Sequence, residues 1–202
     1  MASIILKNVR LAFPELFEPK SFAGEEEGTK RYSANFLIEP GSDNDKLIRK
    51  TISDAVKEKF PEPKKAEQFL KSVQGNSGKF CFNDGDTKSY DGYEGMWYVS
   101  ANRNEDQGAP SVVSGRKDES GKLIPLTKAS GKPYAGCYVN GKIDIWVQTG
   151  KYNGVRASLQ AVQFVADGDA FAGAPASADG FDELDSDDDT GFDWEPKKNE
   201  YY

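Results

Sequence analysis

Hydrophobic and polar residues alternate most regularly in residues 136–165. Successive side chains of a strand point to opposite faces, so this alternation predicts strands with one buried face. Asn153–Gly154 divides the segment, and Asn-Gly is a strong hairpin signal because both residues tolerate positive φ. We therefore expect two long antiparallel strands joined at this pair. In the first strand, the residues expected to face the core are Cys137, Val139, Ile143, Ile145 and Val147.

The second half of this hairpin loses its alternation near its end. Val162 and Phe164 fall on the polar parity, although Val155, Ala157 and Leu159 keep the hydrophobic one. A change of phase of this kind predicts either a bulge or a strand end that is buried on both faces.

Other segments rich in β-forming residues predict further strands at 3–13, 30–38 and 96–103, and shorter ones at 79–83 and 109–113. Pro14 should end the first, because proline cannot donate to a β-ladder. Residues 15–29, 84–95 and 115–132 have the composition of loops.

A helix is predicted between the second and third long strands. Ser42 or Asp43 can cap it with a side-chain oxygen, and Pro61 and Pro63 end it. The hydrophobic residues that recur at helical spacing are Ile48, Ile52, Ala55, Val56 and Phe60. A shorter helix is expected at residues 64–73.

These elements predict a mainly β fold with a helical insertion: an OB-fold-like, partly open antiparallel barrel with one or two helices. A simple OB barrel carries its helix after the third strand, whereas this sequence places it after the second. Either the first strand bends to serve two strands, or the barrel is elaborated.

The composition excludes several kinds of chemistry. The chain of 202 residues contains no histidine and two cysteines, Cys81 and Cys137. Histidine-dependent nucleophilic mechanisms and the HExxH metal site are therefore absent, and no disulfide scaffold is expected. No signal peptide or apolar run of membrane-spanning length is evident, which predicts a cytoplasmic protein, in the host cell if a phage encodes it.

Charge divides the chain into two predicted regions. Residues 1–166, the expected barrel domain, carry 24 basic and 21 acidic residues, whereas residues 167–202 carry two basic and twelve acidic ones. The second region is also rich in Gly and Ala, so we expect a disordered acidic tail. A mildly basic body with an acidic tail suggests nucleic-acid binding.

The segment most like an enzyme site is 84–94, where four carboxylates could hold a metal ion: Asp84, Asp86, Asp91 and Glu94. It fails as an EF-hand loop because Lys88 and Gly95 stand where carboxylates are required, and turn formation explains its Asp and Gly residues. No phosphate-binding glycine motif occurs. We therefore predict a protein that is not an enzyme and needs no metal or cofactor. A metal-dependent nuclease or nucleotide hydrolase is kept as the alternative.

Aromatic residues interleaved with basic ones support a site for single-stranded nucleic acid. Aromatic rings stack on unpaired bases without reading their sequence, and cations neutralise phosphates. Several of these rings could instead belong to the core, in particular one of Trp97 and Tyr98. The candidate binding residues are Trp146, Tyr138, Lys142, Trp97, Tyr98, Arg103, Lys88, Tyr90, Tyr93, Arg31, Lys151 and Arg156.

The tail has two further interpretations. It could serve only for solubility, or it could compete with nucleic acid for the basic groove and recruit protein partners. Aromatic residues among the acids favour the second, since solubility alone does not need them. The residues in question are Asp187, Asp188, Asp189, Phe192, Asp193 and Trp194. A third class of function, an adaptor that binds proteins through this tail, remains open, as does a homodimer in which tails reach each other's grooves.

Five segments resemble one family of bacteriophage proteins. They are NVRLAFPELFEP (8–19), KRYSANFLI (30–38), YDGYEGMWYVSA (90–101), YAGCYVNGKIDIW (134–146) and GVRASLQAVQFVADGDAF (154–171). The family, formerly a domain of unknown function, comprises single-stranded DNA-binding proteins with acidic tails. The resemblance implies an OB-fold, sequence-independent binding of single-stranded DNA, and a role in phage DNA replication, recombination and repair, with replication or recombination proteins as partners.

Overall fold

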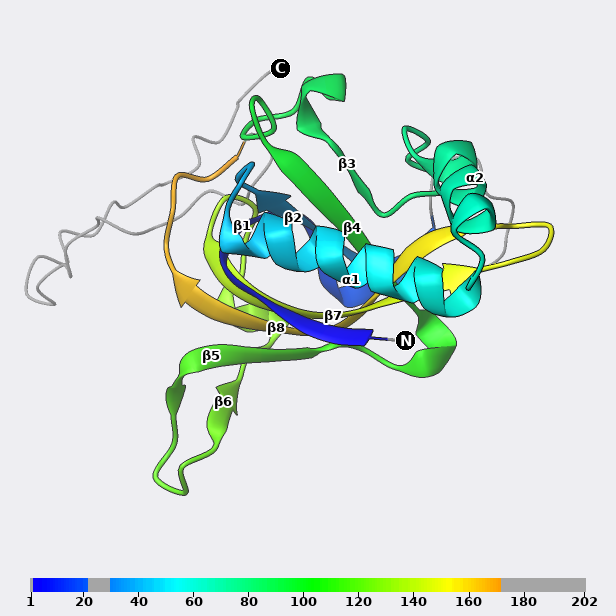
Figure 1. Ribbon diagram of the computed structural model, residues 1–202. Helices are drawn as coiled ribbons and strands as arrows, with labels where there is room; N and C mark the ends of the chain where they lie inside the picture. Colours follow the sequence, from blue (N-terminus) through cyan, green and yellow to red (C-terminus); the bar gives the residue numbers. More distant parts are fainter. Residues whose placement is uncertain (1, 22–29, 172–202) are drawn as a thin grey trace, which may run out of the picture.

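The computed structural model describes residues 2–21 and 30–171 of the chain. Within these ranges the chain forms strands and helices in the order shown in Figure 1. The elements are β1 (Ala2–Lys20), β2 (Arg31–Ile38), α1 (Asp43–Lys59), α2 (Pro63–Val73), β3 (Phe82–Asp84), β4 (Trp97–Asn104), β5 (Ser111–Lys117), β6 (Leu123–Pro125), β7 (Tyr138–Gln148) and β8 (Gly154–Ala166).

Five strands form a closed barrel in the order β1, β2, β4, β8 and β7. Antiparallel pairing joins β4 to β2, β2 to β1, β1 to β7 and β7 to β8. A parallel bridge between Asn102 of β4 and Ser158 of β8 completes the circle. This confirms the predicted mainly β, OB-fold-like architecture, and the barrel is closed in the part of the chain that is described.

Strand β1 bends to serve two neighbours. Its first half, Ala2 to Arg10, pairs with β7, and its second half, Arg10 to Lys20, pairs with β2. The prediction that Pro14 ends this strand is therefore wrong, as is the prediction of a loop directly after it. Pro14 lies in a register shift between Ala12 and Glu15, where no N–H is needed for the ladder.

The hairpin of β7 and β8 is present, but its turn differs from the prediction. Gln148 pairs with Gly154, so the loop spans residues 149–153 rather than the Asn153–Gly154 pair. Gly154 begins β8, where a Cβ would overlap the backbone carbonyl of Lys79. The glycine is needed for this close approach of two backbones, which the sequence of one hairpin does not reveal.

The predicted change of phase in β8 corresponds to real register shifts. Ala161 pairs with Lys142 while Leu159 pairs with Ile143, so Gln160 is the extra residue of a bulge. A second shift lies at the end of the hairpin, between Tyr138 and Val139.

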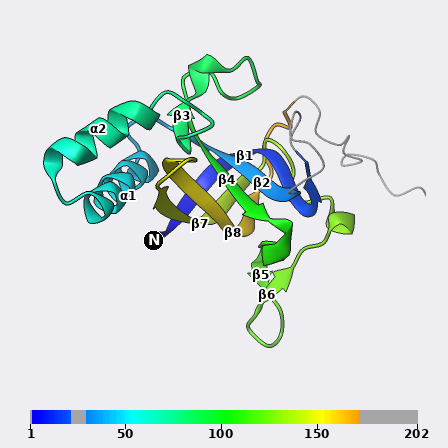
Figure 2. The same cartoon turned by 90° about the vertical axis from the view of Figure 1, so that its right-hand side faces the viewer.

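The two helices form an insertion between β2 and β4, the second and third strands of the barrel. Ser42 caps α1 by accepting a hydrogen bond from the backbone N–H of Asp45. Both explanations offered for the helix position therefore hold. The barrel carries a helical insertion, and β1 bends to pair with two strands. Figure 2 shows the helices at one end of the barrel and residues 167–171 at the other.

The barrel core has the composition that the alternation predicted. Cys137, Val139, Ile143 and Ile145 are fully buried, whereas Val147 is only partly so. Residues 115–132 are more ordered than expected: β5 and β6 pair as an arm that extends away from the barrel (Figure 1). Neither helix of the described ranges is long and apolar enough to cross a membrane.

Candidate nucleic-acid interface

A groove of about 910 Å³ lies where β4 and β8 close the barrel. Its walls come from the start of β2, the outer face of β4, the ends of β7 and β8 with their connecting loop, and residues 77–81 before β3. In an OB-fold, the second and third strands and the loops at this end commonly bind oligonucleotides. We call this surface the first groove.

Three aromatic residues line the first groove: Phe80, which is buried, and Trp146 and Tyr152, which are not. Trp146 is half-buried, and its indole Nε1 donates a hydrogen bond of 3.0 Å to the Ser158 hydroxyl on the neighbouring strand. Tyr152, in the loop between β7 and β8, is 63% exposed. One ring is held in place and the other is open to solvent, so both offer surface for stacking on flat groups.

Two arginines supply positive charge to the same groove. Arg156 is half-buried and donates to the backbone carbonyls of Gly78 and Tyr152. Burial lowers the pKa of Arg156, and the nearby charge of Arg31 lowers it further. The described residues that line this groove include no carboxylate. The positive charge of the two guanidinium groups would attract an anion to this groove.

The rest of the first groove is uncharged: it combines several polar residues with Phe80, Cys81, Val155 and Ala157. Trp146, Arg31 and Arg156 were identified from the sequence, whereas Tyr152 and several uncharged residues were not. The alternation of side chains along β4 alone could have identified Ser100, Asn102 and Asn104, since they alternate with the buried Val99 and Ala101. The uncharged polar lining consists of Ser77, Ser100, Asn102, Asn104, Gln107, Gln148 and Ser158.

Two predicted cations lie near this groove without lining it. The Lys151 ammonium lies 5.2 Å from the centroid of the Tyr152 ring. Arg103 donates to the carbonyls of Gly108 and Gln107 at 2.8 Å each, and to the Gln160 side chain at 2.9 Å. Its guanidinium thus holds the turn after β4 beside the groove.

Two predicted stacking residues belong to the interior. Tyr93 is 1% exposed and Tyr98 4% exposed, in a small cluster outside the barrel. The Tyr93 hydroxyl accepts a hydrogen bond of 2.7 Å from the Asn35 amide. A buried ring has no free face for a base, so neither is a stacking residue. The outer face of β4 looked open because the sequence did not show that the 89–96 loop covers it.

The remaining candidates are dispersed over other surfaces. Trp97 packs on Phe82 beside α1, with the Arg49 guanidinium 4.5 Å from its ring centroid. Tyr138 lies against Arg10, and Lys142 is exposed farther along β7. Lys88 and Tyr90 are exposed on the 88–95 loop. None of these five side chains lines the first groove.

The carboxylates of the 84–94 segment stabilise turns. Asp84 accepts a hydrogen bond from the backbone N–H of Asp86, and Asp86 accepts one from that of Gly95. No group of three or more acidic or cysteine residues suited to a metal ion occurs in the described part of the chain. The geometry thus gives the nuclease alternative no support.

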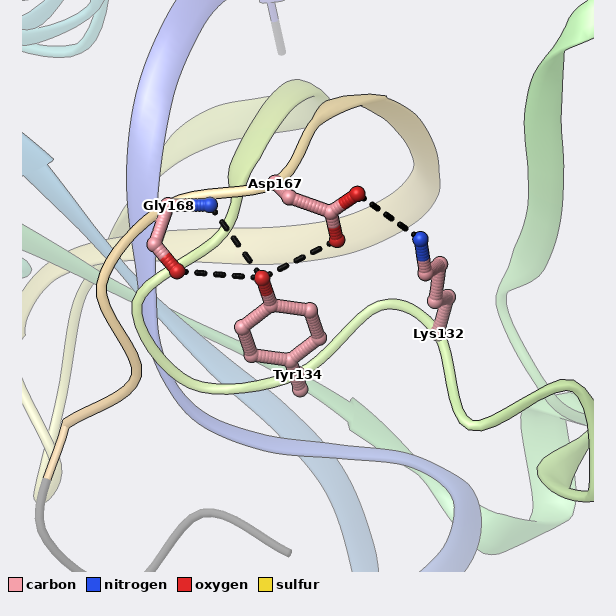
Figure 3. Close-up of polar contacts among 4 residues, drawn as sticks. All are labelled: Lys132, Tyr134, Asp167 and Gly168. Carbon is pink, nitrogen blue, oxygen red and sulfur yellow. Dashed lines mark hydrogen bonds and ion pairs between the residues drawn. The ribbon is translucent and has the colours of Figure 1, made fainter. Parts of the chain in front are cut away.

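Residues 167–171 are attached to the barrel rather than separate from it (Figure 3). The Lys132 ammonium lies 2.8 Å from the Asp167 carboxylate, and this bond lowers the pKa of Asp167. The Tyr134 hydroxyl lies 3.0 Å from both Asp167 Oδ1 and the Gly168 carbonyl, and it accepts from the Gly168 N–H. We call residues 167–171 the strap. The tail candidates Asp187, Asp188, Asp189, Phe192, Asp193 and Trp194 lie outside the described residues.

Comparison with known proteins gives consistent matches. A family model described as the ssDNA-binding protein of Enterobacter phage Enc34 matches residues 2–191. Putative protein p50 of Acyrthosiphon pisum secondary endosymbiont phage 1 is 43% identical over 184 residues, which is 90% of this chain and 93% of that protein.

Solved structures show the same fold at lower identity. The single-stranded DNA-binding protein of bacteriophage Enc34 in complex with ssDNA has a TM-score of 0.62 at 23% identity, with 83% of this chain and 88% of that chain covered. Bacteriophage T7 gp2.5, also a single-stranded DNA-binding protein, has a TM-score of 0.50 at 13% identity, with 91% and 99% covered.

Proposed function

Because this chain belongs to the family of the Enterobacter phage Enc34 ssDNA-binding protein, we propose that its first groove is where it binds single-stranded DNA. The observation that carries this proposal is the pairing of Trp146 and Tyr152 with Arg31 and Arg156 in a groove whose described lining contains no acid. The family is described as ssDNA-binding, which supports a role for the groove in binding and not in catalysis.

The proposed mode of binding uses two kinds of contact. Trp146 and Tyr152 stack on unpaired bases, which stabilises a complex by roughly 1–3 kcal/mol per base and tolerates any sequence. Arg31, Arg156 and Lys151 neutralise phosphates, which releases counterions and makes the affinity depend on salt. The neutral polar residues of β4 and β8 can hydrogen bond to sugars or base edges. Coating of this kind would protect single strands during phage DNA replication, recombination and repair.

We further propose that residues 172–202 modulate this binding. They hold ten acidic and two basic residues, a strongly anionic segment that would compete with DNA for the two arginines. A segment of 31 residues spans at most about 100 Å when fully extended, so it is long enough to reach the groove of its own or another copy. When DNA displaces it, the segment becomes available to replication or recombination proteins.

Fluorescence anisotropy of a labelled oligo-dT across a salt series tests the proposal. We expect binding by the full chain without divalent metal, with a log–log slope near −0.7 per phosphate contacted. Arg156→Gln should weaken binding and make the slope shallower by about 0.7, whereas Arg49→Gln, beside α1, should leave it unchanged. Absence of binding at low salt would refute the proposal. Loss of the oligonucleotide on addition of Mg²⁺ would instead support the nuclease.

A further inference from the structure

A second groove, of about 690 Å³, lies at the other end of the barrel. It shares no lining residue with the first groove, and its lining is rich in aromatic and proline side chains, among them Phe13, Phe17, Tyr90, Tyr134 and Phe171. Figure 1 places the strap, which ends in this groove, on the side opposite the loop between β7 and β8.

The charges around the second groove are already paired. Lys20 lies 2.6 Å from Glu15, Lys128 lies 2.7 Å from Glu18, and Lys132 binds Asp167 of the strap. A phosphate backbone would meet the partner carboxylate at each of these lysines. The second groove is therefore suited to apolar side chains and not to a DNA strand.

Two exposed rings stand at the mouth of this groove. Phe13 is 49% exposed and Tyr90 is 53% exposed, and they meet edge to face with centroids 4.8 Å apart. Phe13 has a φ of +48°, a backbone conformation that is rare for a bulky residue and costs energy. The bend of β1 thus holds an aromatic ring towards solvent at a cost, next to a second aromatic ring.

Phe171, the last residue of the strap, lies in the second groove. Phe171 donates its backbone N–H to the Ala135 carbonyl at 3.0 Å, and the Arg10 guanidinium lies 4.4 Å from its ring centroid. A Cβ on Gly92 would overlap the Phe171 ring, and one on Gly136 would overlap the strap backbone. The barrel is therefore shaped to accept this segment.

We propose that the second groove binds the aromatic side chains of the chain's own residues 172–202, with Phe13 and Tyr90 as the contact rings. The segment continues from Phe171, and residues 172–180 are mainly Ala and Gly, short side chains that allow it to fold back. The aromatic residues that follow are Phe181, Phe192, Trp194, Tyr201 and Tyr202. Because residues 172–202 are covalently tethered to the barrel at Phe171, their effective concentration at the groove is high, so weak aromatic contacts suffice.

Photo-cross-linking of the full chain, in the absence of DNA, tests this proposal independently of DNA binding. The photoreactive amino acid p-benzoylphenylalanine would replace Tyr90, and mass spectrometry would map the products. A mixture of ¹⁴N- and ¹⁵N-labelled protein separates links within one chain from links between chains. We expect links within one chain to peptides from residues 172–202.

Two controls make the outcome decisive. The same probe at Ile5, an exposed residue on the outer face of β1, should give no such products above background. The second control uses the protein that carries the probe at Tyr90. In it, the triple variant Phe181→Ala, Phe192→Ala, Trp194→Ala should lower the yield of cross-links to residues 172–202 about fivefold, whereas Leu184→Ala should leave that yield unchanged. Links confined to residues 2–171, links mainly between chains, or a yield unchanged in the triple variant would each overturn the proposal.

Discussion

Trp146 combines an exposed face with a fixed orientation. Its indole nitrogen is bonded to Ser158, and Arg156 lies directly opposite on the neighbouring strand. A ring held in this way loses little side-chain entropy when it stacks on a base, so more of the stacking energy appears as affinity. Tyr152, in the adjacent loop, lacks such a bond among the described residues and would be ordered on binding.

Replacing Trp146 by Ala should weaken binding of oligo-dT by about 1–3 kcal/mol, or about fivefold to 150-fold, because one stacking ring is lost. The thermal unfolding midpoint should change little, since the ring lies outside the barrel core. Tyr90→Ala, compared in a chain that ends at Phe171 and so lacks the acidic competitor, is the matched control: it removes an aromatic ring of the second groove and should leave DNA affinity unchanged. Equal losses in both variants would mean that DNA also contacts the second groove.

The buried cysteine thiols and the buried Tyr93 hydroxyl predict a loss of stability at alkaline pH. Burial raises the pKa of the Cys81 thiol to about 12, that of Cys137 to about 11 and that of Tyr93 to about 12. Unfolded cysteines ionise near pH 8.5 and tyrosines near pH 10. Above these values the unfolded chain loses protons that the folded chain retains, so the free energy of unfolding should fall between about pH 9 and 11.

Denaturant titrations at pH 8, 9.5 and 10.5 measure this fall. In a Cys81→Ala, Cys137→Ala variant, the onset should move up towards the tyrosine range near pH 10. The same onset in both proteins would show that the thiols do not contribute.

Parity along a strand identified part of the site and misjudged the rest. It placed Trp146 and Arg156 outside the barrel, because pleating decides which face a side chain takes. It could not place Tyr98, because the conformation of the 89–96 loop decides whether this part of the outer face of β4 is covered, and Tyr93 lies in that loop and not on a strand. Tyr152 carried no periodic signal, since it lies in a loop.

The start of β8 links the barrel to the wall of the first groove. The Val155 N–H donates to the Lys79 carbonyl at 2.8 Å, and the Cys81 N–H donates to the Val155 carbonyl at 3.0 Å. These bonds hold residues 79–81 against the strand, and Phe80 and Cys81 line the groove. Gly154 permits the approach by having no side chain.

Gly154→Ala should therefore destabilise the fold by about 1–3 kcal/mol, because a methyl group would overlap the Lys79 backbone. It should also weaken DNA binding by displacing one groove wall. Gly78→Ala is a control for stability only, since its Cβ would meet only the Asn76 side-chain oxygen, at 3.2 Å, but Gly78 itself lines the first groove. Chemical denaturation and anisotropy of both variants test the prediction, and identical stability would contradict it.

Sequence patterns predicted the separate elements better than their connections. The alternation in β2, β7 and β8 and the helical spacing in α1 depend on local burial, and the structure confirms them. The course of β1 past Pro14 depends instead on pairing with two partners far along the chain. The five-residue loop before Gly154 likewise follows from a contact with Lys79, outside the hairpin.

In the molecule as a whole, the two grooves lie at opposite ends of one barrel, and the strap lies at the end that holds the second groove. Composition placed the boundary between body and acidic tail after Ala166, yet Asp167 and Phe171 make specific contacts with the barrel. Local composition does not reveal such contacts, because the partners Lys132, Tyr134 and Ala135 lie about 35 residues earlier in the chain.

Two truncated chains should separate the strap from the acidic segment. A chain ending at Phe171 should unfold at a temperature equal to or slightly below that of the full protein, because only weak contacts of residues 172–202 with the barrel are lost. It should bind oligo-dT more tightly, most clearly at low salt, because an anionic competitor is removed. A chain ending at Ala166 should show the same gain in affinity but a lower unfolding free energy, by about 1–3 kcal/mol, since it loses the Asp167 bonds and the Phe171 packing. Calorimetry and anisotropy on the three proteins measure both effects. Unchanged affinity after removal of residues 172–202 would argue against competition, and equal stability of the two short chains would mean that the strap contributes nothing to the fold.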